Sequence, residues 1–178
     1  MKALVVVDMQ NDFITGALGT DEAQAIVQHV YKKIAEYRRN GDLIVFTRDT
    51  HRDNYLDTRE GTKLPIKHCI KGTLGWKIAD GLVWDECIID KNTFGSTRLV
   101  KYLTHEFWYN KAGHFTEIEI VGLCTDICVV SNALLLKSAF HDYCEITVDA
   151  TCCAGVTPET HEAALRTMEM CQINVKRG

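Results

Sequence analysis

The sequence predicts an α/β fold, with three α/β/α layers built around a mainly parallel, Rossmann-like sheet of five to six strands. Short apolar runs alternate along the chain with segments whose apolar residues recur at helical spacing. Strands that alternate with helices form parallel sheets covered on both faces. The runs are also apolar throughout rather than in alternation, as is typical of strands buried on both faces.

The predicted strands come in a regular order along the chain. The apolar runs are Ala3–Asp8, Leu43–Thr47, Cys87–Asp90, Ile118–Gly122 and Cys144–Val148, and Ile173–Val175 is a candidate for a short edge strand. Helical spacing predicts helices over Asp21–Asn40, which Gly41 ends, and over Thr125–Phe140. A last helix opens at Thr157-Pro158-Glu159. Residues 50–75 are polar and are predicted to form a long functional loop.

Length and composition favour one soluble domain over residues 1–178. Hydrophobic residues make up 46% of the chain and charged residues 25%, an ordinary globular balance. A net charge of −4 leaves no excess of Lys and Arg to neutralise phosphates, which argues against a nucleic-acid partner. No run approaches the roughly 18 apolar residues of a membrane span, and no secretory signal pattern follows Met1. We therefore expect a cytoplasmic protein with eight reduced cysteines and no membrane partner.

Polar and reactive side chains follow the predicted strands at their carboxyl ends. Asp8 ends the first run, Asp49 and His51 follow the second, and Lys91 follows the third. The segment after the fourth run leads to Cys128. Because ligands of parallel sheets bind at the carboxyl ends of the strands, we expect these side chains to share one site.

Cys128 is the candidate nucleophile. It lies where the chain passes from strand into helix, and a thiol in a first helical turn feels the positive end of the helix dipole. We expect this position to lower the pKa of the thiol and to favour the thiolate that attacks carbonyl carbon. Considered alone, a cysteine in such a place is more often a buried structural residue than a nucleophile.

Five short motifs together resemble the isochorismatase-like cysteine hydrolases of nicotinamidase type, from Met1 to about Met168. The motifs are Val6-Val7-Asp8-Met9-Gln10-Asn11-Asp12-Phe13, Thr47-Arg48-Asp49-Thr50-His51, His68-Cys69-Ile70-Lys71-Gly72-Thr73, Lys91-Asn92-Thr93-Phe94-Gly95-Ser96 and Gly122-Leu123-Cys124-Thr125-Asp126-Ile127-Cys128-Val129. The resemblance implies a catalytic triad of Asp8, Lys91 and Cys128. Asp8 would be the general base and acid, and Lys91 the positive charge that keeps Asp8 ionised.

The resemblance further implies an oxyanion hole, a metal site and a homo-oligomer. A cis peptide before Cys124 would direct its backbone N–H, beside that of Cys128, at the oxyanion. Dimers and tetramers are usual for the family, and no organic cofactor is expected. A divalent metal, Zn²⁺, Fe²⁺ or Mn²⁺, would be held by two imidazoles and two carboxylates. These metal-ligand candidates are Asp49, His51, Glu60 and His68. The alternative is that they are ordinary polar residues of the loop, with the charge of Lys67 opposing a cation.

The expected substrate is a small carboxamide, nicotinamide first, with Phe13 and Leu123 as candidate substrate-binding residues. The tryptophan common before the His-Cys pair in nicotinamidases is replaced here by Leu64-Pro65-Ile66-Lys67. The alternative is therefore a metal-free hydrolase of another small amide, carbamoyl or urea compound.

Two other classes of function are disfavoured. A redox protein would need sulfurs better placed than those of Cys124 and Cys128, four residues apart on a helix. A nucleotide-binding module lacks the glycine-rich turn, because Asp8-Met9-Gln10-Asn11-Asp12 follows the first strand instead. Cys87, Cys152 and Cys153 are expected to be small core residues, and the remaining histidines have no partners at metal-ligand spacing.

Overall fold

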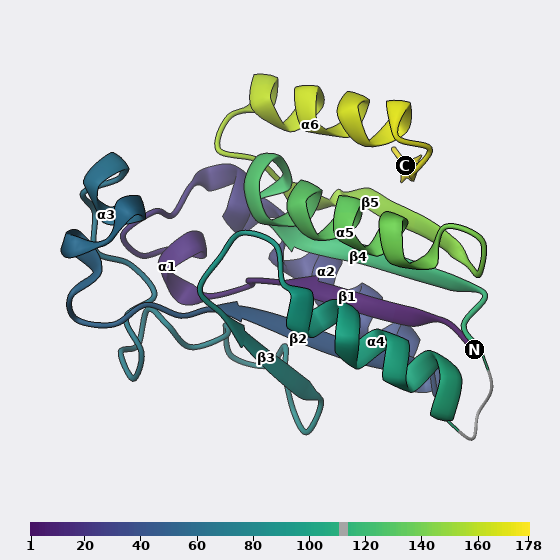
Figure 1. Cartoon of the computed structure of the whole chain (residues 1–178). Coiled ribbons are helices and arrows are strands. Elements are labelled where there is room, and N and C mark those ends of the chain that lie inside the picture. Colours follow the sequence, from purple (N-terminus) through teal and green to yellow (C-terminus); the bar gives the residue numbers. More distant parts are fainter. Residues whose placement is uncertain (111–113) are drawn as a thin grey trace.

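The computed structural model describes residues 1–110 and 114–178 and contains a six-stranded sheet (Figure 1). All neighbouring strands pair in parallel, in the order β3-β2-β1-β4-β5-β6. The strands are β1 (Ala3–Val7), β2 (Leu43–Asp49), β3 (Cys87–Lys91), β4 (Glu117–Leu123), β5 (Glu145–Ala154) and β6 (Asn174–Lys176). The predicted three-layer fold with its mainly parallel sheet is confirmed.

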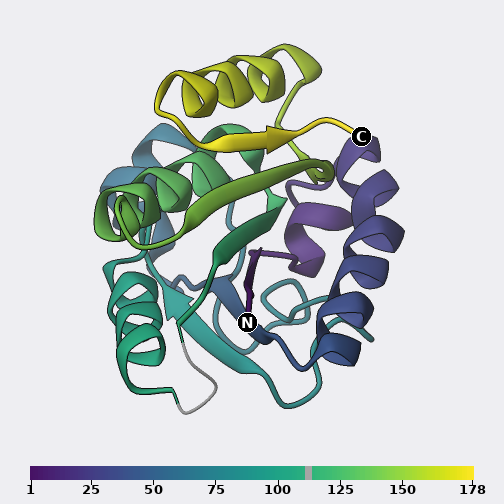
Figure 2. The ribbon, with the colours of Figure 1, turned by 90° about the vertical axis from the view of Figure 1, so that its right-hand side faces the viewer.

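Helices cover both faces of the sheet, as Figure 2 shows. Helix α2 (Asp21–Asn40) lies on one side, while α4 (Thr97–Tyr109) and α5 (Val130–Phe140) lie on the other. Helix α6 (Pro158–Met170) packs on α5 and the β5–β6 edge. In the described ranges no helix has the length and apolar character that crossing a bilayer requires.

Each face of the sheet has its own hydrophobic core. Val5 and Val7 of β1 face the core shared with α4, α5 and α6, whereas Leu4 and Val6 face the core shared with α2. This alternation along one strand buries both sides of β1, which explains why its sequence is apolar at every position.

Local signals explain where the predicted helices begin and end. The Thr20 side chain accepts a hydrogen bond from the Ala23 N–H at the start of α2, and Gly41 ends that helix with a φ of 70°. At the start of α6, Thr157 and Thr160 form a reciprocal capping box and Pro158 occupies the first turn.

Several elements differ from the sequence prediction. Helix α4 and the short α1 (Asn11–Ile14) are additional to the predicted helices. The predicted loop over residues 50–75 contains a 3-10 turn at Tyr55–Asp57 and the short helix α3 (Arg59–Lys63). Strand β5 continues beyond Val148 to Ala154. The helices within the loop are short and are stabilised by tertiary contacts. Their sequences therefore show no helical spacing of apolar residues from which they could be predicted.

Candidate active site

The candidate residues gather at the carboxyl edge of the sheet, where Figure 1 shows α1 and α3. Asp8 directly follows β1, Asp49 is the last residue of β2, and Lys91 is the last residue of β3. Cys128 lies in the turn that leads from β4 to α5. The strand order reverses direction between β1 and β4, and such reversal points are where open parallel sheets bind ligands.

Asp8, Lys91 and Cys128 meet in a buried group. The Lys91 Nζ lies 2.6 Å from Asp8 Oδ2 and donates a hydrogen bond to the Cys128 Sγ at 3.4 Å. Asp8 is fully buried, Lys91 is 4% exposed and Cys128 is 6% exposed. Thr47 donates a hydrogen bond to the other carboxylate oxygen of Asp8, at 2.7 Å. The cation is therefore shared between the carboxylate and the thiol.

Burial dominates the electrostatics of this group. Burial and the neighbouring Asp8 charge raise the pKa of the Cys128 thiol well above its ordinary value, although Lys91 acts in the opposite direction. Burial also raises the pKa of Asp8, and Lys91 again opposes the shift. Burial alone would lower the pKa of Lys91, but the negatively charged Asp8 beside it outweighs that effect and raises the pKa. Lys91 thus stays charged.

The expectation of a resting thiolate at Cys128 is corrected by these pKa directions. The helix dipole was expected to lower the thiol pKa, but desolvation of the buried sulfur is the larger effect. The first turn is also π-helical over Thr125–Val129, with the N–H of Val129 bonded to the Cys124 carbonyl oxygen at 3.0 Å. Burial therefore favours the protonated thiol, whose proton a base must remove before the sulfur can attack.

The turn that carries Cys128 has the predicted backbone. The peptide bond between Leu123 and Cys124 is cis, as expected from the resemblance. That the backbone N–H groups of Cys124 and Cys128 form an oxyanion hole remains a prediction.

Glycine is required where β4 approaches β1 just before this turn. Gly122 has a φ of 117°, and a Cβ atom there would overlap the carbonyl oxygen of Val7. The close approach keeps the end of β4 beside Asp8, which follows Val7.

The four candidate metal ligands also come together. The ligand atoms of Asp49, His51, Glu60 and His68 lie within 4.8 Å of one another. His51 Nε2 is 2.9 Å from Asp49 Oδ2, and His68 Nε2 is 3.7 Å from the same oxygen. Glu60 Oε1 lies 3.7 Å from His51 and 3.8 Å from His68. Two imidazoles and two carboxylates converging on one point fit Zn²⁺, Fe²⁺ or Mn²⁺.

The Asp49 carboxylate is held in its ionised form, as a metal ligand must be. Burial would raise the pKa of Asp49, but its hydrogen bonds with His51 and His68 together with the charge of Lys91 lower it. Lys67 is exposed, so water screens the positive charge that was expected to oppose a metal. Lys91 Nζ lies 3.6 Å from Asp49 Oδ1, which makes the Asp8–Lys91–Cys128 group and the metal-ligand group neighbours.

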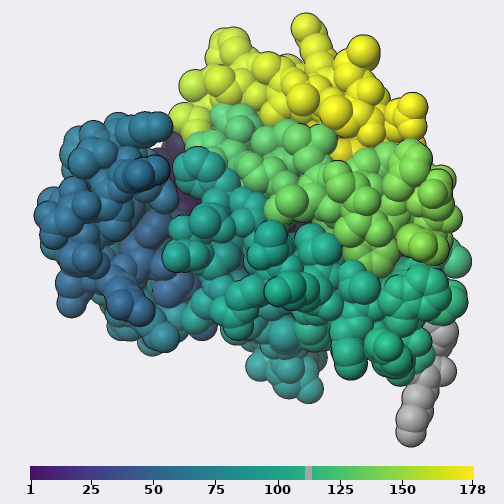
Figure 3. Space-filling model, in the orientation of Figure 1, coloured from purple at the N-terminus to yellow at the C-terminus, as the bar shows by residue number. Residues whose placement is uncertain are grey.

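A cavity of about 530 Å³ opens onto both groups. The predicted Phe13 lines it, with its ring 5.6 Å from that of His68, and so do Cys124, Cys128 and Glu60. Leu123 is fully buried in the core on the α2 side and is absent from the cavity lining, so its side chain is not positioned to touch a ligand there. In Figure 3 the segment around α3 stands out beside the main body, and α3 supplies part of the cavity rim.

Several residues that shape the site escaped the sequence prediction. The Gln10 side chain accepts a hydrogen bond from the Asp49 N–H and donates to the Asp49 carbonyl oxygen, which fixes the end of β2. Tyr55 is fully buried with its ring against both His51 and His68. Phe94, half exposed, lines the cavity. The position of Gln10 and Phe94 inside the quoted motifs was the available signal, whereas Tyr55 offered none beyond its place between the two histidines.

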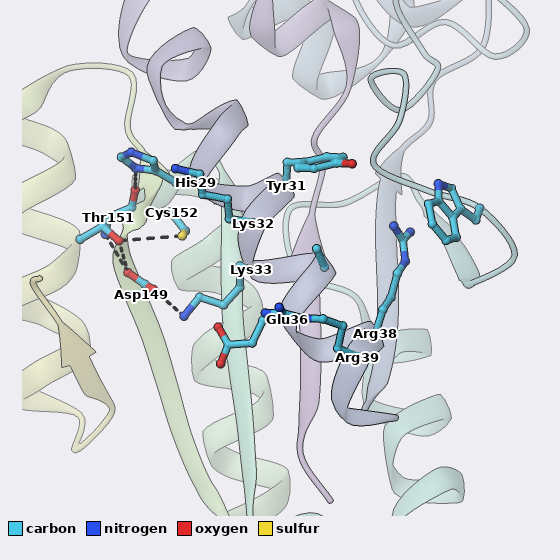
Figure 4. A pocket seen from close by; sticks show the side chains of 12 residues that line it. His29, Tyr31, Lys32, Lys33, Glu36, Arg38, Arg39, Asp149, Thr151 and Cys152 are labelled. Carbon is cyan, nitrogen blue, oxygen red and sulfur yellow. Dashed lines mark hydrogen bonds and ion pairs between the residues drawn. The ribbon is translucent and has the colours of Figure 1, made fainter.

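A larger groove of about 930 Å³ lies elsewhere, around the outer side of α2 (Figure 4). Two of its cations are paired, Lys33 with Glu119 and Asp149, and Arg38 with Glu86. The thiol of Cys152 lies beside the Thr151 hydroxyl and the Asp149 carboxylate. Burial, followed by the Asp149 charge, raises the pKa of this thiol to about 11, so the groove does not favour the thiolate that nucleophilic chemistry needs.

Comparison with known proteins identifies the family of this chain. Residues 2–176 match the family described as the isochorismatase domain. The chain belongs to the isochorismatase family. An Arabidopsis thaliana relative named "probable inactive nicotinamidase" is 30% identical, over 98% of this chain and 90% of the relative. The nicotinamidase/pyrazinamidase of Mycobacterium tuberculosis is 27% identical over 98% of both chains.

A solved structure extends the comparison of this isochorismatase-family chain to a metal-bound relative. The pyrazinamidase of Pyrococcus horikoshii in complex with zinc superposes with a TM-score of 0.83 and 31% identity, covering 99% of each chain. The relatives thus share the whole fold, and one of them binds zinc.

Proposed function

We propose that this chain hydrolyses a small carboxamide, nicotinamide first, to the carboxylic acid and ammonia through a thioester on Cys128. Its family match and its nicotinamidase relatives make it a hydrolase of C–N bonds other than peptide bonds. The observation that carries the mechanism is Lys91, whose Nζ contacts both the Asp8 carboxylate and the Cys128 sulfur beside the cavity.

Asp8 acts first as a base in the proposed reaction. It takes the proton of the Cys128 thiol while the sulfur attacks the amide carbonyl carbon, and Lys91 balances the charge that moves between them. The N–H groups of Cys124 and Cys128 stabilise the tetrahedral oxyanion.

Asp8 then acts as an acid and as a base again. It returns the proton to the leaving nitrogen, ammonia departs, and a thioester forms on Cys128. Asp8 next takes a proton from water as the water attacks the thioester. Release of the acid returns that proton to the thiol, so that each turnover consumes one water and one amide.

The metal-ligand group favours a substrate that contains a pyridine-type ring. Asp49, His51, Glu60 and His68 would hold Zn²⁺, Fe²⁺ or Mn²⁺, which when bound supplies a Lewis acid that can fix a ring nitrogen. Phe13 offers an aromatic surface for the ring on the same side of the cavity. We further propose that residues 1–178 act as one hydrolase domain, in the cytoplasm, as a dimer or tetramer.

Ammonia release tests the function. We expect turnover of nicotinamide and pyrazinamide by protein purified without chelator or metal-affinity step, with about one metal ion per chain by elemental analysis. Carbamoyl compounds and ureas complete the panel. Turnover of only these compounds, with no bound metal, would move the substrate to the metal-free alternative. The Arabidopsis relative is named as a probable inactive enzyme, so a complete lack of activity is a real outcome of this experiment. No turnover of any compound on the panel would reject the proposal.

A further inference from the structure

The turn that carries Cys128 is fastened to α6 by a side-chain hydrogen bond. Thr125 follows the cis peptide by one residue, and its hydroxyl group is fully buried. His161, in the first turns of α6, has its Nδ1 2.8 Å from the Thr125 Oγ1. Figure 1 shows the start of α6 above the start of α5, at the active-site end of the molecule.

A second contact joins the same two segments. The carboxylate of Asp126 accepts the backbone N–H of Val156 at 3.1 and 3.2 Å. The preceding Gly155 permits the approach, because a Cβ atom there would be only 2.9 Å from the Cβ of His161. Ile127 and Val156 both line the cavity, so the joined segments form one wall of it.

Side chains outside the turn help to hold its backbone: Asn132 donates a hydrogen bond to the Cys128 carbonyl oxygen, and Ser131 donates one to that of Ile127. The N–H groups of Ile127 and Val129 both bond to the Cys124 carbonyl oxygen, as expected of a π-helical turn rather than a regular helix. Contacts from outside the turn therefore contribute to where the Cys128 sulfur lies. Burial lowers the pKa of His161, so its ring is neutral at pH 7 and suits a bond with an uncharged hydroxyl group.

We propose that His161 is a positioning residue that, through the Thr125 hydroxyl, holds the π-helical turn so that the Cys128 sulfur stays aligned with its base. The inference rests on the proposed cysteine mechanism. His161 touches neither the substrate nor the reacting atoms, so its loss changes the rate of the chemical step and leaves substrate binding in place.

Two series of variants test this role. His161→Ala and Thr125→Val remove the hydrogen bond, while His161→Asn and Thr125→Ser retain a polar partner at the same place. His29→Ala is the matched control, since His29 Nδ1 also makes a hydrogen bond, to the Thr151 carbonyl oxygen in the groove outside the active site. The readouts are kcat and KM for nicotinamide, the iodoacetamide alkylation rate of Cys128 by peptide mass spectrometry, and the thermal unfolding midpoint.

We expect His161→Ala and Thr125→Val each to lower kcat and the alkylation rate by about twofold to tenfold, the effect of one hydrogen bond. KM should change less than twofold, and the double variant should be no worse than either single one. His161→Asn and Thr125→Ser should recover most of the loss, and His29→Ala should show none. Unchanged alkylation in both non-polar variants, or equal losses in the His29 control, would overturn the role.

The design separates this inference from the proposed function. If no carboxamide is hydrolysed, the alkylation rate still reports the position of the sulfur. If His161→Ala does not fold, the Thr125→Val and Thr125→Ser pair decides with the same readouts.

Discussion

Lys91 determines how protons are distributed in the candidate active site. Its ammonium group lies between Asp8, Cys128 and Asp49, at 2.6, 3.4 and 3.6 Å. Burial pushes the pKa of both Asp8 and the thiol upward, and Lys91 is the charge that opposes this in each case. A buried cation with such partners costs desolvation energy that its partners must offset.

Removing the nucleophile should abolish turnover without unfolding the protein. Cys128→Ala deletes one buried sulfur, and we expect no ammonia release from any amide on the panel. Cys124→Ala is the control, because that thiol also lines the cavity but only its backbone is assigned a role. Comparable activity in the two variants would contradict the assignment of Cys128.

The acid limb of the pH–rate profile should report Asp8. The base must be ionised, so kcat/KM falls as the pH drops through the pKa of Asp8, which burial raises. Lys91 holds that pKa down, so Lys91→Ala should move the acid limb to higher pH as well as reduce the maximum rate. Lys63→Ala, at the cavity rim, is the control. An acid limb at the same pH in both variants would contradict the role of Lys91.

Loss of one imidazole should separate metal binding from thiol chemistry. His51→Ala should reduce the metal content and raise KM for nicotinamide, because a ring nitrogen loses its anchor. Alkylation of Cys128 should change much less, since His51 does not contact the sulfur. Exposed His141 provides the control by the same substitution. Full metal content in His51→Ala, measured by elemental analysis, would reject this ligand.

At the scale of elements, the sequence predicted the strands and the shared site edge better than the residues that fix them. Continuous apolar runs identify β1 and β2 because both of their faces are buried, and the polar residues after them could be placed by topology alone. Gln10 and His161 could not be predicted in this way. Their roles depend on hydrogen bonds to residues 39 and 36 positions away, which no local pattern encodes.

Helix α4 was missed although it carries a readable pattern. Ser96 caps it, and the buried Leu99, Leu103 and Phe107 are spaced four residues apart. The prediction of a lowered pKa for the Cys128 thiol was wrong for a different reason. Sequence shows that a cysteine begins a helix, but not that the turn is enclosed, and enclosure reverses the direction of the shift.

The junction between β1 and β4 should be sensitive to a single methyl group. Gly122→Ala places a Cβ against the Val7 carbonyl oxygen and forces a positive φ on alanine, so we expect a loss of at least about 2 kcal/mol in unfolding free energy. Gly72→Ala is the control, with a φ of 90° but nothing within 4 Å of the new atom. Urea unfolding measures both. Equal losses would show that the backbone angle alone matters.

At the scale of the whole molecule, a network of charges joins both ends of the described chain. Glu117 on β4 pairs with Lys2 and Lys176, and Lys33 on α2 pairs with Glu119 and Asp149. Burial opposes ionisation of Glu117, but its hydrogen bonds with Lys2 and Lys176 lower its pKa to about 2. The network thus ties α2 to the three strands β4, β5 and β6 and to Lys2, which precedes β1.

This network should make the fold sensitive to acid. A carboxylate with a depressed pKa contributes stability that is present above its unfolded value of 4.5 and lost as the pH falls toward about 2. The pKa of Asp149 is also lowered, by Lys33 and Thr151 against the effect of burial, and adds in the same direction. We expect the thermal midpoint to fall between pH 5 and about pH 2. Glu117→Gln should show a smaller fall, and an identical fall would exclude this carboxylate as a contributor.

The strand order also divides the enzyme into two halves that are made at different times. Strands β3, β2 and β1 lie on one side of the reversal point and come from the first 91 residues, while β4, β5 and β6 lie on the other. The proposed general base Asp8, Lys91 and all four metal-ligand candidates therefore leave the ribosome before the sulfur of Cys128 does. In the proposed mechanism, hydrolysis requires that β4 has paired with β1. Separate fragments ending at Asn110 and starting at Glu117 would each be inert, and mixing them would turn amide hydrolysis into a direct reporter of that docking.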